Sequence, residues 1–278
     1  MNKLQTYILE IVRYFDVFCK KHSIEYFIMG GSALGAARHK GFIPWDDDFD
    51  LFMTQDNYLR LVELKNEFEN DRFCLQPINS PVNPLFMGKV RMKNTLLIEG
   101  NGDNYKKEIC HGIYIDIMVL FDGCKTLFGR KKQFLFAKIL SANRLSLDGY
   151  ETKSLRKKVF TSFSNFLVKI MGREHFYKFI AKKRNSNYYC HLFGRAPYKK
   201  SFYPIEWFKG VIDTEFESLH LPLMQGYKEY LSLRYGCDYM KLPDKKTLQQ
   251  YPSHASYVNY LSDTDTRLDN SIFGGGNK

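Results

Sequence analysis

Hydrophobic and polar positions along the chain follow two alternating periods, which predict helices and strands in turn. Apolar residues recur at helical spacing over residues 4–19, as in an amphipathic helix whose apolar side packs on a sheet. Short apolar runs at residues 24–29 and 49–53 predict strands, and residues 57–70 predict another helix. With a helix start after the first strand, the order is α, β, α, β, α, which is typical of a small α/β core.

The same periodicity continues beyond a loop rich in Pro and Asn. Further elements are expected as strands over residues 86–92, 96–99 and 112–121 and as a helix over residues 225–235. Lys89 and Arg91 fall on one face of the first of these strands. Two cations on a core strand would suit a diphosphate, whereas an edge strand with solvated basic side chains would give the same pattern.

Asp116 is the single acid in the most apolar stretch of the chain, residues 112–121. A carboxylate inside a buried strand is costly unless a partner or a metal ion neutralises it. This position therefore favours a functional carboxylate. The alternative is an acid at the strand end that caps the following turn.

Gly30, Gly31 and Ser32 follow the first predicted strand and precede a helical stretch, which predicts a tight turn leading into a helix. Glycine lets the backbone approach a ligand closely, and N–H groups at a helix N-terminus attract anions. The sequence therefore predicts a phosphate-binding turn.

A run of acids follows this turn at close spacing. If residues 49–53 form a strand, Asp48 and Asp50 point to one side while Phe49 and Leu51 point into the core. Two adjacent carboxylates repel each other unless a proton or a cation lies between them. The pair beside a phosphate turn favours Mg²⁺-assisted phosphoryl or nucleotidyl transfer over a helix cap or a solvated acidic edge.

Composition describes a chain that can bury a sizeable core, with 278 residues, 44% of them hydrophobic, and a net charge of +11. No apolar run is long enough for a transmembrane helix, and acids interrupt the N-terminal apolar positions, so no signal peptide is expected. These features predict a cytoplasmic protein. Six scattered cysteines indicate reduced, mostly structural thiols, although the pairs Cys110–His111 and Cys190–His191 leave a zinc site open.

Residues 125–200 are strongly basic, with 19 Lys and Arg against three acids, so the rest of the chain carries a net negative charge. Apolar residues recur there at helical spacing among the lysines. Such helices can lie on an anionic bilayer, or can pack on the core with solvated lysines outward. No nucleic-acid-binding module is legible in this stretch, and no nucleic-acid partner is expected.

Two motifs carry a resemblance to a known family. The string GGSALGAARHKGFIPWDDDFDL at residues 30–51 closely resembles the signature of the LicD family, which belongs to the nucleotidyltransferase superfamily and is related to fukutin and fukutin-related protein. The string YGCDYMKLP at residues 235–243 resembles the C-terminal signature of the same family. The resemblance extends over about residues 22–245 and is weakest across the basic stretch.

The resemblance implies a Mg²⁺-dependent phosphotransferase, with Mn²⁺ as an alternative ion. It would move phosphocholine or a polyol phosphate from a CDP-linked donor to a sugar of a cell-surface polysaccharide or its lipid-linked precursor. The metal and catalytic ligands would be Asp48, Asp50 and Asp116. Substrate-binding residues would be Gly30, Gly31, Ser32, Arg38, Asp47, Lys89 and Arg91. Asp116 or Asp47 would accept the proton of the acceptor hydroxyl.

These observations predict an α/β (α+β) fold with a nucleotidyltransferase-like mixed sheet and a basic helical insert. The expected divisions are a catalytic core over residues 1–124, the insert over 125–200, a C-terminal part completing the core over 201–260, and a disordered tail over 261–278. The protein would be cytoplasmic, with peripheral contact to the inner face of the membrane through the insert. Nucleotidyl transfer and a catalytically inactive glycan-binding or membrane-binding relative remain alternatives.

Overall fold

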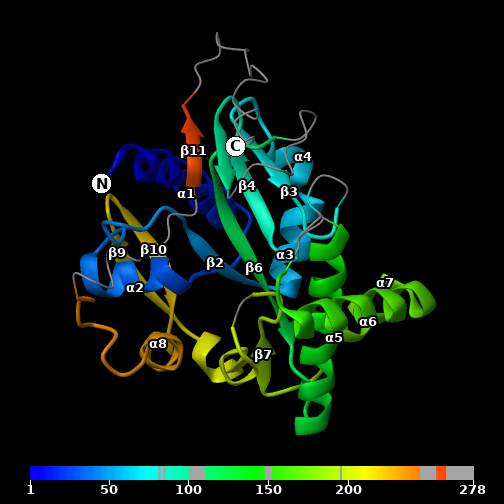
Figure 1. Cartoon of the computed structure of the whole chain (residues 1–278). Helices are drawn as coiled ribbons and strands as arrows, with labels where there is room; N and C mark the ends of the chain where they lie inside the picture. Colours follow the sequence, from blue (N-terminus) through cyan, green and yellow to red (C-terminus); the bar gives the residue numbers. More distant parts are fainter. Residues whose placement is uncertain are drawn as a thin grey trace.

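The computed structural model describes residues 1–80, 83, 86–99, 110–147, 152–194, 196–244 and 255–260 (Figure 1). The helices are α1 (Lys3–Lys21), α2 (Gly30–His39), α3 (Gln55–Glu63), α4 (Lys65–Phe68), α5 (Leu127–Leu147), α6 (Leu155–Met171), α7 (Arg173–Ala181) and α8 (Tyr227–Tyr235), with 3-10 turns η1 (Tyr198–Lys200) and η2 (Ile205–Phe208). The strands are β1 (Phe27–Ile28), β2 (Asp50–Thr54), β3 (Phe73–Gln76), β4 (Gly88–Met92), β5 (Leu96–Glu99), β6 (Tyr114–Asp122), β7 (Tyr188–Cys190), β8 (Phe202–Pro204), β9 (Val211–Phe216), β10 (Leu219–Met224) and β11 (Ala255–Asn259). The expected tail over residues 261–278 lies outside the described residues.

A large mixed sheet forms the centre of the molecule, with strand order β3-β4-β6-β2-β1-β10-β9. Strands β2 and β6 pair in parallel in the middle of this order, and β4 pairs antiparallel to β6. Strands β7 and β8 extend the sheet from the far end of β6, and β11 pairs with β5 in a separate two-stranded ribbon. The mixed α/β fold with a sheet core, predicted from the alternating periods, is confirmed.

Strand β2 is buried on both faces, because Leu51, Phe52 and Met53 are all fully buried. This departs from the expected alternation of a half-buried strand and is the pattern of an interior strand of a covered sheet. Helix α3 packs against β2 and β6, and α1 packs against β4 and β6. The side chains that interrupt this apolar centre therefore need specific partners.

Helix α1 begins with a reciprocal cap between Asn2 and Gln5. The side-chain amide of Gln5 is buried and donates to the backbone carbonyls of Ile43 and Asp46, at 3.1 and 2.9 Å. The amide thereby fixes the loop that carries the acidic run into β2. The start of the chain thus helps to hold the segment on which the site depends.

The basic stretch folds as helices α5, α6 and α7, which pack on one another and project beside the sheet (Figure 1). Helix α7 contacts β6, and Gln133 of α5 is completely buried, with its amide donating to Asp122 O and Ile180 O. Among the described residues, no helix combines the length and the apolar character needed to cross a bilayer.

Several element boundaries differ from those expected. The helix expected over residues 57–70 is divided into α3 and α4, and the tight turn expected at the glycines is absent, because α2 begins at Gly30 itself. Strand β2 begins at Asp50, so Asp48 precedes the strand and does not alternate within it. Strand β4 lies between β3 and β6, so the edge-strand interpretation of Lys89 and Arg91 is wrong.

Candidate active site

Asp50 and Asp116 lie opposite each other on the parallel strands β2 and β6, where they are Cα register partners. The Asp116 N–H donates to Phe49 O at 2.9 Å, which extends the ladder to the residue before β2. Asp116 is the third residue of β6 and only 8% exposed, so the interpretation of it as a strand-end cap is wrong. The sheet register therefore brings two carboxylates from distant parts of the sequence side by side.

The backbone of Asp50 is held from two directions. Its N–H donates to Ser32 Oγ of α2 at 2.9 Å, and its carbonyl accepts the N–H of Met29 at 3.1 Å. Because Met29 directly precedes α2 and Ser32 lies in its first turn, these bonds fix the start of β2 to the start of that helix. Ser32 thus has a structural role that the sequence alone did not indicate.

Lys89 is the cross-strand partner of Asp116 on β4, and it is 3% exposed. Its Nζ lies 2.8 Å from Asp116 Oδ1 and 3.9 Å from Glu99 Oε2. The same ammonium lies 3.3 Å from the centroid of the Tyr114 ring, in a cation–π contact. A buried lysine thus faces the buried carboxylates from the neighbouring strand.

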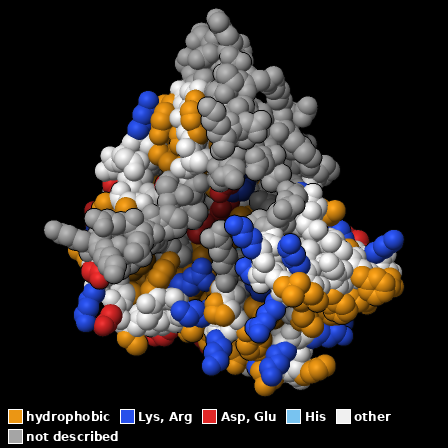
Figure 2. All heavy atoms as spheres, in the orientation of Figure 1, with side chains coloured by type: hydrophobic (Ala, Val, Ile, Leu, Met, Phe, Trp, Pro, Cys, Tyr) orange, Lys and Arg blue, Asp and Glu red, His pale blue; other side chains and the backbone are white. Residues whose placement is uncertain are grey.

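The electrostatic balance of this cluster is negative. Burial raises the pKa of Asp50 well above its ordinary value, and the charges of Asp48 and Asp116 raise it further. Burial also raises the pKa of Asp116, while the ammonium of Lys89 acts in the opposite direction. Lys89 and Arg91 both act on Asp116, whereas burial and the neighbouring carboxylates dominate at Asp50, so a proton or a further cation is favoured beside Asp50. Figure 2 shows acidic and basic side chains meeting in a hollow near the centre of the face drawn.

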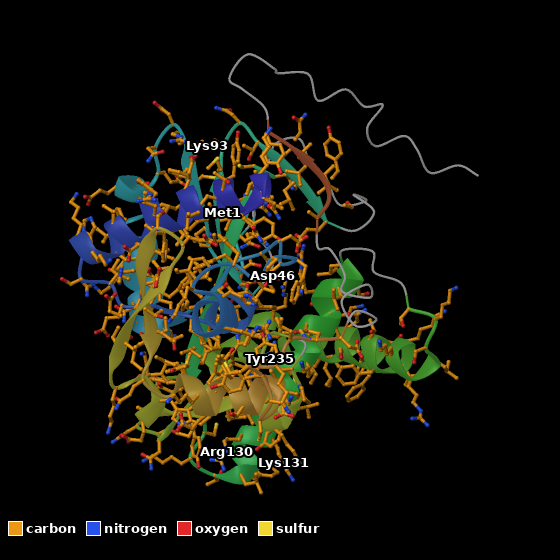
Figure 3. The ribbon with its side chains drawn as sticks, turned by 90° about the vertical axis from the view of Figure 1, so that its left-hand side faces the viewer. Met1, Asp46, Lys93, Arg130, Lys131 and Tyr235 are labelled. Carbon is orange, nitrogen blue, oxygen red and sulfur yellow. The ribbon has the colours of Figure 1, made fainter. Side chains whose placement is uncertain are left out.

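The two glycines at the start of α2 are required by the acids around them. Gly30 has φ +58°, in the region that favours glycine, and a Cβ there would lie 3.3 Å from Asp50 Oδ2. A Cβ on Gly31 would lie 2.3 Å from Asp46 Oδ2, which is closer than such atoms approach. Asp46 lies beside α2, and Tyr235 ends α8 below it (Figure 3). The Gly-Gly pair therefore lets α2 begin directly against the acidic segment.

The first N–H of α2 is already bonded within the protein, because Gly30 N donates to Tyr230 Oη of α8 at 3.0 Å. Tyr230 is fully buried, and burial raises its pKa to about 12, so the hydroxyl stays protonated at neutral pH. Sequence reasoning missed this residue. A tyrosine in an apolar helical pattern gives no signal of a polar contact 200 residues away.

The remaining predicted substrate residues are distributed around this centre. Arg91 lies on the same face of β4 as Lys89, is 7% exposed, and donates to Gln76 Oε1 and Gly112 O, each at 2.7 Å. Asp47 Oδ2 accepts the N–H of Ala255 at 3.0 Å. Arg91 and Asp47 therefore make structural contacts in addition to any that they make with a ligand.

Arg38 lies at the other end of α2. Its guanidinium donates to Tyr239 O at 3.0 Å and to Lys241 O at 3.2 Å. These bonds join the first family-like motif to the second across more than 200 residues of sequence. Arg38 is thus placed by the chain segment after α8.

The donor set around Asp50 suits the divalent ion that the family resemblance implies. Carboxylate oxygens are preferred ligands of Mg²⁺, and Asp116 Oδ1 is buried with an ion pair but no hydrogen bond. In the ranges that the structure describes, no three His, Cys, Asp or Glu side chains form a group arranged around one metal position. The cation that faces Asp116 in this arrangement is the Lys89 ammonium. Metal binding by Asp48, Asp50 and Asp116 would require their side chains to converge further.

The cysteine and histidine pairs considered for zinc have other contacts. Cys190 Sγ donates to Phe121 O, and the His191 ring packs against Phe52. The Cys110 carbonyl accepts a hydrogen bond from the Gln76 amide. These contacts serve the packing of β6 and β3 with their neighbours.

Comparison with known proteins connects this site to a family. Residues 23–80, which run from β1 through β3, match the family described as LicD/FKTN/FKRP, nucleotidyltransferase domain. The chain is 28% identical over 269 residues to the lipopolysaccharide cholinephosphotransferase LicD of Haemophilus influenzae, covering 93% of this chain and 98% of that protein. It is also 41% identical over 49 residues to an uncharacterised protein of Rickettsia prowazekii, which covers 18% of each chain.

Proposed function

We propose that this chain is a phosphotransferase of the LicD family, on the strength of its matched nucleotidyltransferase domain and its nearly full-length similarity to the Haemophilus influenzae protein. It transfers phosphocholine, or a polyol phosphate, from a CDP-linked donor to a sugar hydroxyl. The acceptor is a cell-surface polysaccharide or its lipid-linked precursor. The observation that carries the proposal is the register pairing of Asp50 with Asp116, next to Lys89 and the start of α2.

Mg²⁺, held by Asp48, Asp50 and Asp116, would supply positive charge that neutralises and orients the donor diphosphate. Burial raises the pKa of Asp50, and the charges of Asp48 and Asp116 raise it further; this supports the ligand set, because a divalent cation relieves the repulsion among the carboxylates. Mn²⁺ has the same ligand preferences and would serve in its place.

The protein's own groups then bind the donor and remove a proton. Lys89 and Arg91 place two positive charges on one face of β4, where they bind phosphate oxygens. Arg38 and the Gly31–Ser32 segment, all in α2, also bind the phosphates of the donor. Asp47 or Asp116 accepts the proton of the acceptor hydroxyl as it attacks the β-phosphorus of the donor, and CMP leaves.

The test is release of CMP from CDP-choline, CDP-glycerol and CDP-ribitol by the purified protein, with Mg²⁺ and purified glycan present. We expect one donor to give CMP and a glycan that carries the corresponding phosphate. The variants D50N and D116N should lower the rate at least about 10²-fold, in keeping with the loss of a group that stabilises transition-state charge. The matched control is D213N, an exposed aspartate of β9 paired with His220.

Product analysis separates the proposal from its alternatives. Release of pyrophosphate with a nucleotide attached to the acceptor would indicate nucleotidyl transfer instead. Absence of turnover with all three donors and glycan would contradict phosphotransfer and favour a binding protein that retains the fold.

A further inference from the structure

Helix α6 carries an apolar stripe on its outer surface. Five large apolar side chains on this helix are between 52% and 75% exposed: Leu155, Val159, Phe163, Phe166 and Ile170. At 3.6 residues per turn, these positions fall within an arc of about 80°. A continuous stripe of this kind differs from the single exposed apolar residues that are ordinary on protein surfaces.

The opposite side of α6 already packs against the rest of the protein. Ser164 and Val168 are buried there, and Asn165 exchanges hydrogen bonds with Asn143 and Ser146 of α5. The inner face of α6 is therefore buried and hydrogen-bonded to α5, whereas its outer face is apolar and exposed. Helix α6 thus packs on the core through one side, as one of the two arrangements considered for this stretch requires, while part of its apolar surface faces outward.

Basic side chains border the stripe along both edges. Lys158 and Lys169 fall on one side of the apolar arc and Arg156 on the other, by the same helical geometry. The helix contains no acidic residue over Leu155–Met171. Figure 2 shows hydrophobic side chains interleaved with Lys and Arg over the α5–α7 region. The outer surface of α6 thus consists of an apolar stripe with positively charged side chains along both edges.

We propose that α6 docks this protein on an anionic lipid bilayer, with Phe163 and Phe166 entering the boundary between headgroups and acyl chains. Such helices lie in the plane of the interface, where apolar burial and attraction to anionic lipids act together. Charge complementarity favours this occupant over a second copy of the chain, because pairing two α6 stripes would bring their basic borders together. The docking is independent of transfer activity.

The experiment is co-sedimentation of the full chain with vesicles, in the absence of donor and acceptor. Phosphatidylcholine vesicles with and without phosphatidylglycerol are compared at low and high salt. We expect binding to the anionic vesicles that weakens with salt, and weak binding to phosphatidylcholine alone.

Three variants assign the binding to α6. F163S/F166S should lower the partition coefficient at least about tenfold, since two exposed aromatic side chains are lost from the inserted face. K158Q/K169Q should lower it about fivefold per lysine on anionic vesicles only. The matched control is L59S/V211S, which removes two similarly exposed apolar side chains outside α6 and should bind as wild type. Circular dichroism and thermal unfolding verify that each variant is folded.

Unchanged binding in F163S/F166S, or equal binding to vesicles with and without anionic lipid, would overturn the proposal. So would absence of vesicle binding by the wild-type protein. A dimer seen by light scattering that dissociates in F163S/F166S would show that a second copy covers the stripe, and would also overturn it.

Discussion

Replacing Lys89 with methionine tests whether the buried ammonium supports the carboxylate cluster. In the native protein its Nζ lies 2.8 Å from Asp116 Oδ1 and over the Tyr114 ring, and the lysine is only 3% exposed. Removing one partner of a buried ion pair leaves the other uncompensated and costs about 3–5 kcal/mol. With a urea m-value of about 3 kcal/mol/M, the unfolding midpoint should fall by about 1–1.7 M.

The matched variant is K89M/D116N, which removes both charges. Its loss of stability should be smaller than the sum of the two single losses by about 2 kcal/mol, because neither charge is left buried alone. The loss in K89M should also shrink at lower pH. Without the ammonium, the pKa of Asp116 in the folded state lies further above its value in the unfolded state. As the pH falls, the Asp116 carboxylate is therefore protonated in the folded chain before it is protonated in the unfolded chain, and the free energy of unfolding rises.

Urea unfolding of the wild type and the three variants at pH 7 and pH 5 measures these quantities. A K89M loss below about 1 kcal/mol would refute the reasoning, and so would strict additivity of the two single variants. Either result would mean that Lys89 and Asp116 do not interact as their geometry indicates.

Three further predictions concern the surroundings of the site. G31A should lower stability by about 1–3 kcal/mol in thermal unfolding, because its Cβ would lie 2.3 Å from Asp46 Oδ2; an unchanged Tm would show that the acid moves freely. Y230F should cost about 1–3 kcal/mol, since the buried Gly30 N–H loses its acceptor, and a loss no larger than that of an exposed Tyr-to-Phe control, Y257F, would contradict this. Burial lowers the pKa of His191 to about 4 in the folded chain, from its ordinary value of 6.5. As the pH falls below 6.5, this imidazole therefore takes up a proton in the unfolded chain before it does so in the folded chain. Stability should therefore decline by about 3 kcal/mol from pH 7 to pH 4 through this group, and H191Q should decline less.

Much of the secondary structure could be predicted from periodicity, because long apolar patterns determine which side of an element is buried. Helix α1 was expected over residues 4–19 and spans Lys3–Lys21, and the expected strand over residues 96–99 coincides with β5. Boundaries at the acidic run were less predictable. Asp48 lies outside β2 because that strand begins only where pairing with β6 begins, at Asp50 opposite Asp116.

The candidate site was predicted only in part, because its geometry depends on pairings between distant strands. An isolated acid in an apolar strand was enough to single out Asp116. No local pattern placed Lys89 opposite it, since that depends on β4 lying between β3 and β6. The contacts of Gln5, Ser32 and Tyr230 depend on tertiary packing and could not be predicted from spacing.

Binding of a divalent ion by the acidic cluster is the central claim, and it can be measured without turnover. Mn²⁺ is titrated into the full chain in the presence of CDP, and the free ion is followed by electron paramagnetic resonance. We expect one ion to bind the wild-type protein, with affinity at least about tenfold weaker in D50N and in D116N and unchanged in D213N. Equal Mn²⁺ binding by the wild type, D50N and D116N, or no binding by the wild type, would contradict the assignment of these carboxylates as metal ligands.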